Sequence, residues 1–399
     1  MANKRVVVIG GGPAGHDAAT YAARFGAEVT LIERDIVGGA AHLRDCVPSK
    51  SMIATGGALS FARRLDGMGL ANVETGVDAD HLRARIQGLE QRLEQSVTQL
   101  LTSQGVTIHR GTGRLLGPNE VCVDTPNGVV ELTADAIVLA TGSRPRIPEW
   151  APIDHERVLT TRDAYPPAQI PEHLVVVGSG VTGVEFVHMF ASLGSEVTLI
   201  VSRQQVLPQK DPEAAALLEH NFLDRGVQLL KGARATEILR KGQSVTVHCS
   251  DGRIAQGSHA LLAIGSDPNS QGLGLENTDI AIDDDGYIQV DHNLRSSVPT
   301  IYAAGDLSGK LPLSSVAAMQ GRKIAEHIMG LHEGREHRHL DYDKAASAIF
   351  TEPEIADVGL AEAEAFATGR KIRVTKVCLL YTSDAADDMQ CVDLGGRRI

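Results

Sequence analysis

Residues 6–15 read VVVIGGGPAG, a short β-branched run followed at once by a glycine-rich turn. The apolar residues after the turn predict a helix, and EVTLIE at residues 28–33 predicts a second strand. In such a unit Gly10 makes the tight turn, Gly12 lets the backbone approach a pyrophosphate, and Gly15 lets the helix pack closely on the strand. Glu33 then falls where a carboxylate accepts the hydroxyl groups of an adenosine ribose. The stretch therefore predicts a dinucleotide-binding site.

The same pattern returns downstream, where LVVV at residues 174–177 leads into GSGVTG at residues 178–183. A helix and a strand ending at Val201 are expected to follow, and two such units in one chain indicate two nucleotides. Val201 stands where the first unit has Glu33, and Arg203 comes just after it. The second unit thus lacks a carboxylate that would favour a free 2′-hydroxyl, and Arg203 can contact a 2′-phosphate. NADPH is therefore an acceptable ligand. The alternative for Arg203 is a solvated surface charge, so NADH stays open.

Between the two units, apolar residues recur at spacings of three and four, which predicts a long helix with one face packed on a core. The residues of this stripe are Leu82, Ile86, Leu89, Leu93, Val97 and Leu100. A strand is expected at residues 105–109, and another apolar run begins at Ala136 and ends before Thr141.

Composition narrows the class of protein. The 399 residues predict two or three domains whose cores need no disulfides or metals. The net charge of −12 offers no basic field for a nucleic acid or an anionic membrane. No apolar stretch is long enough for a signal peptide or a membrane span, so we expect a cytoplasmic protein. The five cysteines are scattered and odd in number, which disfavours a disulfide framework and a zinc site.

The last stretch, residues 378–399, differs in character from the rest. Back-translated with suitable codons, CLLYTSDAAD and VDLGGRRI look like parts of one transposon-type sequencing adapter, in the right order. We therefore interpret this stretch as a non-native tail and expect the genuine sequence to be interrupted after Val377. The alternative is a genuine but unusual tail.

These motifs resemble the flavoprotein disulfide reductases, the pyridine-nucleotide disulfide oxidoreductases that include dihydrolipoamide dehydrogenase and glutathione reductase. Besides the two glycine-rich units, the resemblance rests on ATGS at 140–143, IGSDPN at 264–269, TIYAAGD at 300–306 and FTEPEIADVG at 350–359. It implies an α/β fold with two Rossmann-like domains of the three-layer ββα type. The implied segments are 1–165 and 288–340 for FAD, 166–287 for an inserted NAD(P)H domain, and 345–377 for the start of a truncated α+β dimerisation domain.

The segment GGAAHLRDCVPSK, residues 38–50, is the most informative part of this resemblance. In the disulfide reductases it carries two cysteines beside the flavin; here Cys46 keeps its place and Ala41 replaces the other. A single thiol has no partner sulfur with which to cycle between dithiol and disulfide. As the flavin-side cysteine, Cys46 would be a thiolate with a lowered pKa; the alternative is an inert small hydrophobe. The resemblance also implies that Lys50 and Glu185 form an ion pair beside the flavin and the nicotinamide.

One group of family members without the disulfide has this same altered segment, and the sequence resembles it most: the NAD(P)H quinone dehydrogenases of actinobacterial type, formerly labelled lipoamide dehydrogenases. This resemblance implies an enzyme that passes a hydride from NADPH or NADH to FAD and then two electrons to a quinone. The catalytic candidates are Cys46, Lys50 and Glu185. The alternatives are a dihydrolipoamide dehydrogenase-like or transhydrogenase-like flavoenzyme, and a non-catalytic flavin-binding protein.

The resemblance gives a set of candidate cofactor-binding residues and no metal ligands. The expected partners are a quinone-type acceptor and, for the full-length protein, a second copy of the chain in a homodimer. The family's C-terminal His–Glu dyad lies beyond the genuine sequence, so we expect this chain to dimerise poorly. The cofactor-binding candidates are Gly10, Gly12, Pro13, Ala14, Gly15, Glu33, Arg34, Gly39, Ala40, Cys46, Lys50, Gly113, Ala140, Thr141, Gly142, Gly178, Gly180, Val181, Gly183, Glu185, Arg203, Gly265, Gly305, Asp306 and Ala317.

Overall fold

The computed structural model describes residues 4–65, 76–165, 167–331 and 339–376. Residues 1–359 form one compact unit, and a second, small unit begins at Leu360. Its described residues, 360–376, include helix α7 (Glu362–Ala367). The interpretation of residues 378–399 as a non-native tail falls outside the described residues, and the domain boundaries given above stay predictions.

The first glycine-rich unit belongs to a five-stranded sheet that is parallel throughout, with strand order β18-β7-β1-β2-β3. Because β2 pairs with one edge of β1 and β7 with the other, the winding of the chain reverses between β1 and β7. Such a reversal opens a crevice at the carboxyl ends of the strands, where ligands bind in open α/β sheets. The strands are β1 (Arg5–Ile9), β2 (Glu28–Glu33), β3 (Thr107–Arg110), β7 (Ala136–Leu139) and β18 (Ile301–Ala303).

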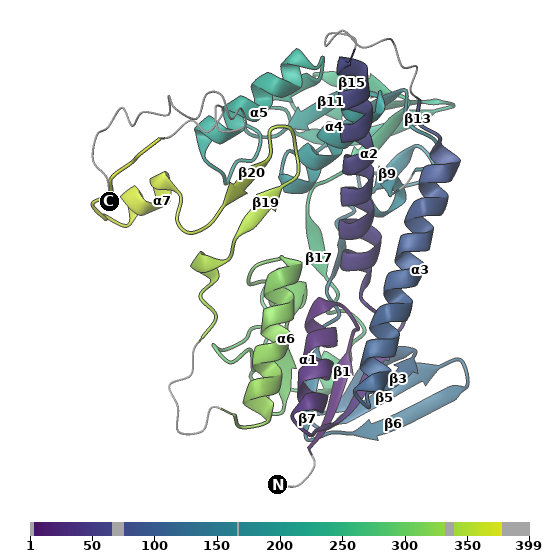
Figure 1. The fold of residues 1–399 in the computed structure, drawn as a ribbon, viewed down its shortest axis with the longest axis vertical. Helices are drawn as coiled ribbons and strands as arrows, with labels where there is room; N and C mark the ends of the chain where they lie inside the picture. Colours follow the sequence, from purple (N-terminus) through teal and green to yellow (C-terminus); the bar gives the residue numbers. More distant parts are fainter. Residues whose placement is uncertain (1–3, 66–75, 166, 332–338, 377–399) are drawn as a thin grey trace. The chain divides into compact units, whose positions relative to one another are not determined.

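Helices cover one face of this sheet and an antiparallel sheet covers the other. Helices α1 (Pro13–Arg24) and α6 (Ser314–Ile328) lie side by side (Figure 1) and bury alanines and Ile324 against the strands. Strands β4 (Thr112–Gly117), β5 (Glu120–Thr125) and β6 (Gly128–Thr133) form the antiparallel sheet, whose Leu115, Val121 and Val123 pack on the opposite face. The result is the expected three-layer arrangement.

The second glycine-rich unit builds the same architecture again. Its five parallel strands have the order β12-β11-β10-β16-β9. They are β9 (Val158–Thr160), β10 (His173–Val177), β11 (Glu196–Val201), β12 (Gln228–Lys231) and β16 (His259–Leu262). Helices α4 (Val181–Leu193) and α5 (Pro212–Asp224) cover one face, and β13 (Ala235–Lys241), β14 (Ser244–Cys249) and β15 (Ile254–Gly257) cover the other. This repeat confirms the prediction of two Rossmann-like units.

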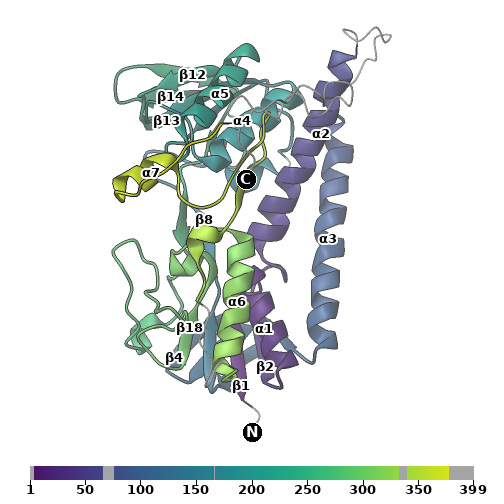
Figure 2. The same ribbon diagram turned by 60° about the vertical axis from the view of Figure 1, so that its left-hand side comes forward.

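Two long helices, α2 (Val47–Arg64) and α3 (Ala79–Ser103), lie side by side (Figure 2). Helix α3 contributes Leu82 and Ile86 to the core around α4 and Leu101 to the core around α1. The predicted helix is therefore confirmed, but its last predicted core residue is wrong: Leu100 is 44% exposed and Leu101 is fully buried. The reason is that the packed face rotates around the helix where α3 leaves one core and joins the other.

Two short strand pairs also belong to the compact unit formed by residues 1–359. β8 (Ser143–Pro145) pairs with β17 (Ser266–Pro268), and β19 (Ser347–Ile349) pairs with β20 (Ile355–Asp357). Ile349 at the end of β19 is buried in the core around α4. Within the described ranges, no helix is long and apolar enough to cross a membrane, and no three His, Cys, Asp or Glu residues are grouped to hold a metal ion.

Candidate functional site

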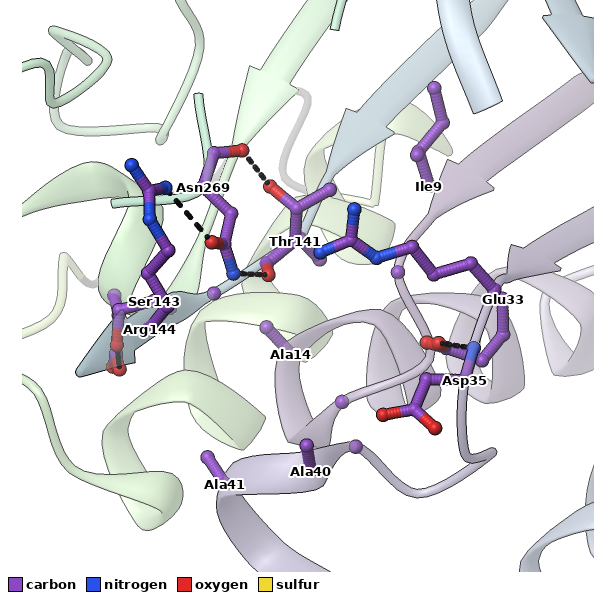
Figure 3. Close-up of a pocket in the computed structure, with 18 of the residues that line it drawn as sticks. Ile9, Ala14, Glu33, Asp35, Ala40, Ala41, Thr141, Ser143, Arg144 and Asn269 are labelled. Carbon is purple, nitrogen blue, oxygen red and sulfur yellow. Dashed lines mark hydrogen bonds between the residues drawn. The ribbon is translucent and has the colours of Figure 1, made fainter. Parts of the chain in front are cut away.

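A cavity of about 450 Å³ lies at the carboxyl ends of β1, β2 and β7 (Figure 3). This is the crevice that the strand order of the first sheet opens. Sixteen of the predicted cofactor-binding residues line it: Gly10, Gly12, Pro13, Ala14, Glu33, Arg34, Gly39, Ala40, Cys46, Gly113, Ala140, Thr141, Gly142, Gly305, Asp306 and Ala317. They come from segments far apart in the sequence, and the fold gathers them around one space.

The glycines at the start of α1 are required by close backbone contacts. Gly10 has φ +103°, and a Cβ there would lie 2.3 Å from the Ala140 carbonyl oxygen. A Cβ on Gly15 would lie 1.9 Å from the Gly10 carbonyl oxygen, so Gly15 packs against the turn and does not line the cavity. At Gly12, by contrast, the nearest atom to an added Cβ is 3.9 Å away, at Gly39. The backbone of Gly12 is therefore open to the cavity.

The Glu33 carboxylate lies at the wall of this cavity and is 9% exposed. Its Oε2 accepts a hydrogen bond from the Gly11 backbone N–H at 2.7 Å, and its Oε1 accepts one from the Asp35 N–H at 2.7 Å. Each carboxylate oxygen accepts more than one hydrogen bond, so these contacts fix the side chain without exhausting its capacity. The turn thus holds a buried, oriented carboxyl group at the cavity wall.

The opposite part of the cavity is held by polar contacts between distant segments. The Ser143 hydroxyl donates to Asp306 Oδ2 at 2.6 Å, and the Gly305 N–H donates to Oε1 of the fully buried Gln320 at 2.7 Å. Figure 3 shows Asn269 between Thr141 and Arg144: its side chain donates to the Thr141 carbonyl and accepts from Arg144. The bonds of Asn269 join the segment after β7 to the residue that follows β17, and the Ser143–Asp306 bond joins β8 to the segment after β18.

The second glycine-rich turn repeats the geometry of the first. Gly178 has φ +110°, with a Cβ position 2.3 Å from the Ala263 carbonyl oxygen, and a Cβ on Gly183 would lie 1.9 Å from the Gly178 carbonyl oxygen. Gly180 has no atom within 4 Å of its Cβ position, so the start of α4 is open. The neighbouring predicted residues, Val181 and Arg203, are exposed, and Gly265 follows β16 with φ +101°. None of these residues of the second turn lines the cavity beside the first glycine-rich turn.

Lys50 and Glu185 form an ion pair between α2 and α4. Lys50 Nζ lies 3.2 Å from Glu185 Oε2, and the Glu185 side chain is only 9% exposed. The backbone N–H of Phe350 donates to Glu185 Oε1 at 3.0 Å, and Lys50 Nζ lies 4.5 Å from the centre of the Phe350 ring. A contact of this kind between an ammonium and an aromatic face is attractive. Three segments of the chain therefore fix the position of the pair.

Ala41 and Cys46 begin and end a π-helical turn (Ala41–Cys46) that leads directly into α2, and both line the cavity. The described cysteines, Cys46, Cys122 and Cys249, are all unpaired. The expected lowering of the pKa of Cys46 is not what the surrounding protein groups produce. Burial raises the pKa of this thiol, and the nearby Lys50 only partly opposes it. Burial dominates because it removes water from the thiolate, and Asp45 and Glu185 add like charge.

Sequence reasoning missed several residues that line the cavity. Arg162 and Gln271 reach it from outside the recognised motifs, and so do Leu273, Pro312 and Ser314. Asn269 is the last residue of IGSDPN and Arg144 directly follows ATGS, so these two motifs were the available signal. Arg162 had no such signal, because it lies in a short 3₁₀ turn (Thr161–Ala164) after β9.

Comparisons with known proteins agree on one family. The family model described as pyridine nucleotide-disulphide oxidoreductase matches residues 4–321. The chain is 43% identical over 370 residues to the NAD(P)H dehydrogenase (quinone) of Mycobacterium tuberculosis, covering 90% of this chain and 74% of that protein. It is 33% identical over 374 residues to the dihydrolipoyl dehydrogenase of Chlamydia muridarum, covering 93% and 78%.

A solved structure agrees with these sequence matches. The crystal structure of LpdA from Mycobacterium tuberculosis superposes with a TM-score of 0.86 at 42% identity, covering 92% of this chain and 80% of that one.

Proposed function

The chain belongs to the pyridine nucleotide-disulphide oxidoreductase family, and on that premise we propose that it oxidises NAD(P)H and reduces a quinone without a redox-active disulfide. Proteins of this family are oxidoreductases that use FAD and NAD(P)H. The observation that carries the proposal is Ala41 at the start of the turn that ends at Cys46, in the wall of the cavity. The name of the 43% identical relative supports the choice of acceptor.

The residues around the cavity fit FAD. Gly12 leaves the backbone at the start of α1 open, where free N–H groups attract a pyrophosphate. The carboxyl groups of Glu33 and Asp306 place hydrogen-bond acceptors at two separate points of the cavity wall. This suits the ribose hydroxyl groups and the ribitol chain of FAD. A volume of about 450 Å³ lies within the range of about 300–1,000 Å³ that small-molecule cofactor sites span. When bound there, FAD supplies the two-electron chemistry that links a nicotinamide to the acceptor.

For the nicotinamide nucleotide we propose the open start of α4, with Gly178, Gly180 and Gly183 forming the turn. Glu185 lies one helical turn farther along α4, where Lys50 and the Phe350 N–H hold its carboxylate in place. Because these contacts leave Glu185 little freedom, we propose that the pair orients the nicotinamide ring. Arg203 is exposed at the end of β11, a position from which it can meet a 2′-phosphate. Both NADPH and NADH remain substrates in this proposal.

The proposed acceptor is a quinone because the site has one cysteine where dithiol exchange needs two. Reduction of a flat quinone requires only that the quinone reach the cavity, and it involves no sulfur chemistry. Dihydrolipoamide oxidation, the activity named for the 33% identical relative, would require Cys46 to be paired with a resolving thiol. Among the described residues the remaining cysteines, Cys122 and Cys249, are buried in β5 and β14, away from the cavity.

The experiment is a comparison of two acceptors with the purified protein. We expect NADPH or NADH oxidation with menadione to be faster by at least about 100-fold than NAD⁺ reduction with dihydrolipoamide, a difference of roughly 3 kcal/mol in barrier. The Ala41→Cys variant is the matched control, because it supplies the second thiol at the start of the turn that ends at Cys46. Faster turnover of dihydrolipoamide than of menadione by the wild-type protein would reject the proposal.

A flavin-binding protein without catalysis is distinguished by a second observation. Anaerobic NADPH should bleach the yellow flavin, and menadione should restore the colour. Protein that stays yellow under excess NADPH and NADH would be a binding protein.

A further inference from the structure

The carboxyl group that precedes Cys46 in the sequence pairs with a guanidinium, and neither belongs to the FAD contacts proposed above or to the Lys50–Glu185 pair. Asp45 is the penultimate residue of the π-helical turn, and Arg162 lies in the 3₁₀ turn after β9. Arg162 Nη2 lies 3.4 Å from Asp45 Oδ2, and about 30% of each side chain is exposed, 30% for Arg162 and 27% for Asp45. Arg162 lines the cavity together with Cys46 and Ala41.

Each partner keeps a polar atom without a hydrogen bond. Asp45 Oδ1 and Arg162 Nε are both buried, and neither has a hydrogen-bond partner among the described residues. A buried polar atom without a partner is costly, and such atoms are uncommon in native proteins. Two of them occur in one ion pair. Its Arg162 lines the cavity, and its Asp45 directly precedes the lining residue Cys46, so the pair is placed to meet a further polar group there. A neighbouring carboxylate–guanidinium pair, Asp35–Arg44, lacks this feature: Arg44 Nη1 donates to both carboxylate oxygens, and both side chains are exposed.

The charges around Asp45 allow it to carry a proton near neutral pH. Burial raises the pKa of its carboxyl to about 6, with a smaller raising contribution from Asp306, while Arg162 and Arg44 oppose the shift. The other groups that face it are the Cys46 thiol and the buried Tyr165 hydroxyl, and Asp45 helps to raise the pKa of both. A carboxyl group with a pKa near the working pH is suited to act as a general acid.

We propose that Arg162 and Asp45 form the acceptor subsite, in which Arg162 donates a hydrogen bond to a quinone carbonyl oxygen and Asp45 supplies a proton to the reduced oxygen. This inference rests on the proposed quinone reductase function. A quinone needs two electrons and two protons to become a hydroquinone, and the hydride of NAD(P)H carries two electrons and one proton. The second proton comes from Asp45: its O–H bond breaks as the hydroquinone O–H bond forms, and the carboxylate regains a proton from solvent.

The test compares an acceptor that needs protons with one that does not. In the Asp45→Asn holoenzyme we expect kcat with menadione to fall by about 100-fold, the usual contribution of a general acid. The rate with ferricyanide, which accepts single electrons and no proton, should stay within about twofold, as should anaerobic flavin bleaching by NADPH. The matched control is Asp251→Asn, which removes a carboxylate that pairs with Arg253 at 2.6 Å, outside the residues that line the cavity. It should change neither rate.

The pH dependence and quinone binding give two further readouts. The wild-type menadione rate should fall as the pH rises through about 6, because the proton-bearing form of Asp45 is lost; the Asp45→Asn rate should be flat. The Arg162→Gln variant should bind menadione about 10-fold more weakly in a titration of the oxidised holoprotein, because it loses one charge-assisted hydrogen bond. It should keep its ferricyanide rate.

The outcomes separate this inference from the function on which it rests. Equal loss of the menadione and ferricyanide rates in Asp45→Asn, or unchanged menadione binding in Arg162→Gln, would overturn the subsite. A wild-type protein that reduces ferricyanide with NADPH but not menadione would instead overturn the proposed function.

Discussion

At the scale of single residues, Asp45 is a carboxyl group for which burial outweighs two nearby guanidinium groups. Burial raises its pKa to about 6 from a usual value of 3.8. A folded-state pKa above the unfolded one means that the folded protein binds a proton more tightly than the unfolded chain does. The contribution of Asp45 to stability is therefore full below about pH 4 and is lost as the pH rises through about 6.

This sign leads to a prediction for the Asp45→Asn variant. Between pH 4 and pH 7 the wild-type protein should lose stability relative to the variant, by no more than about 3 kcal/mol, since one pKa unit corresponds to about 1.4 kcal/mol. Urea unfolding of both proteins at several pH values measures the difference. If the free energy of unfolding of the wild-type protein instead rises relative to that of the variant as the pH rises, then Arg162 and Arg44 outweigh burial and the pKa of Asp45 is lowered.

Single residues also show where sequence reasoning succeeds and where it stops. Glu33 could be assigned to the cavity wall because its distance from Gly15 and its place at the end of a strand are local features. The Asp45–Arg162 pair could not, because the two residues are far apart in the chain and meet only through the packing of the two sheet units. The protein's own effect on the pKa of Cys46 could not be predicted either, because it depends on burial, which the sequence does not display; the lowering expected from a bound flavin stays a prediction.

At the scale of elements, the crossing of α2 and α4 depends on one of two adjacent glycines. A Cβ on Gly56 would lie 2.8 Å from the Cβ of Ser192, so the two helices approach closely at this point. Gly57, the next residue of α2, has no atom within 4 Å of its Cβ position. This crossing also sets the distance between Lys50 on α2 and Glu185 on α4.

The two glycines should respond in opposite ways to alanine. Gly57→Ala should stabilise the protein by about 0.5–1 kcal/mol, because alanine favours the helix. Gly56→Ala should destabilise it by about 1–3 kcal/mol, because the added methyl group overpacks the crossing. Chemical denaturation measures both, and each variant is the control for the other. A stabilising Gly56→Ala would show that α2 and α4 are not held at this distance.

Element boundaries were predictable where the local signal is strong. The strands at residues 28–33 and 196–201 match β2 and β11 at both ends, since each is a β-branched run that begins with a glutamate and is followed by a polar residue. The long helix was also predicted, but its buried face was wrong at Leu100. Apolar periodicity describes one packed face, whereas α3 packs on two cores in succession.

At the scale of the whole molecule, the chain uses one architecture twice within its larger unit. In both copies the first glycine of the turn lies against the carbonyl of the residue after a neighbouring strand, Ala140 in one and Ala263 in the other. The Lys50–Glu185 pair connects the α2 segment to the second copy, and the Phe350 N–H adds a third segment. This arrangement is consistent with the proposed electron transfer between a nicotinamide nucleotide at one sheet and FAD at the other.

The most direct test of the central claim is a rapid-mixing experiment on the reduced protein. Holoprotein is reduced anaerobically with one equivalent of NADPH and then mixed with menadione or with lipoamide, and flavin absorbance is followed. We predict that the flavin colour returns with menadione at a rate no slower than steady-state turnover and does not return with lipoamide. Reoxidation by lipoamide, with menadione ineffective, would contradict the account.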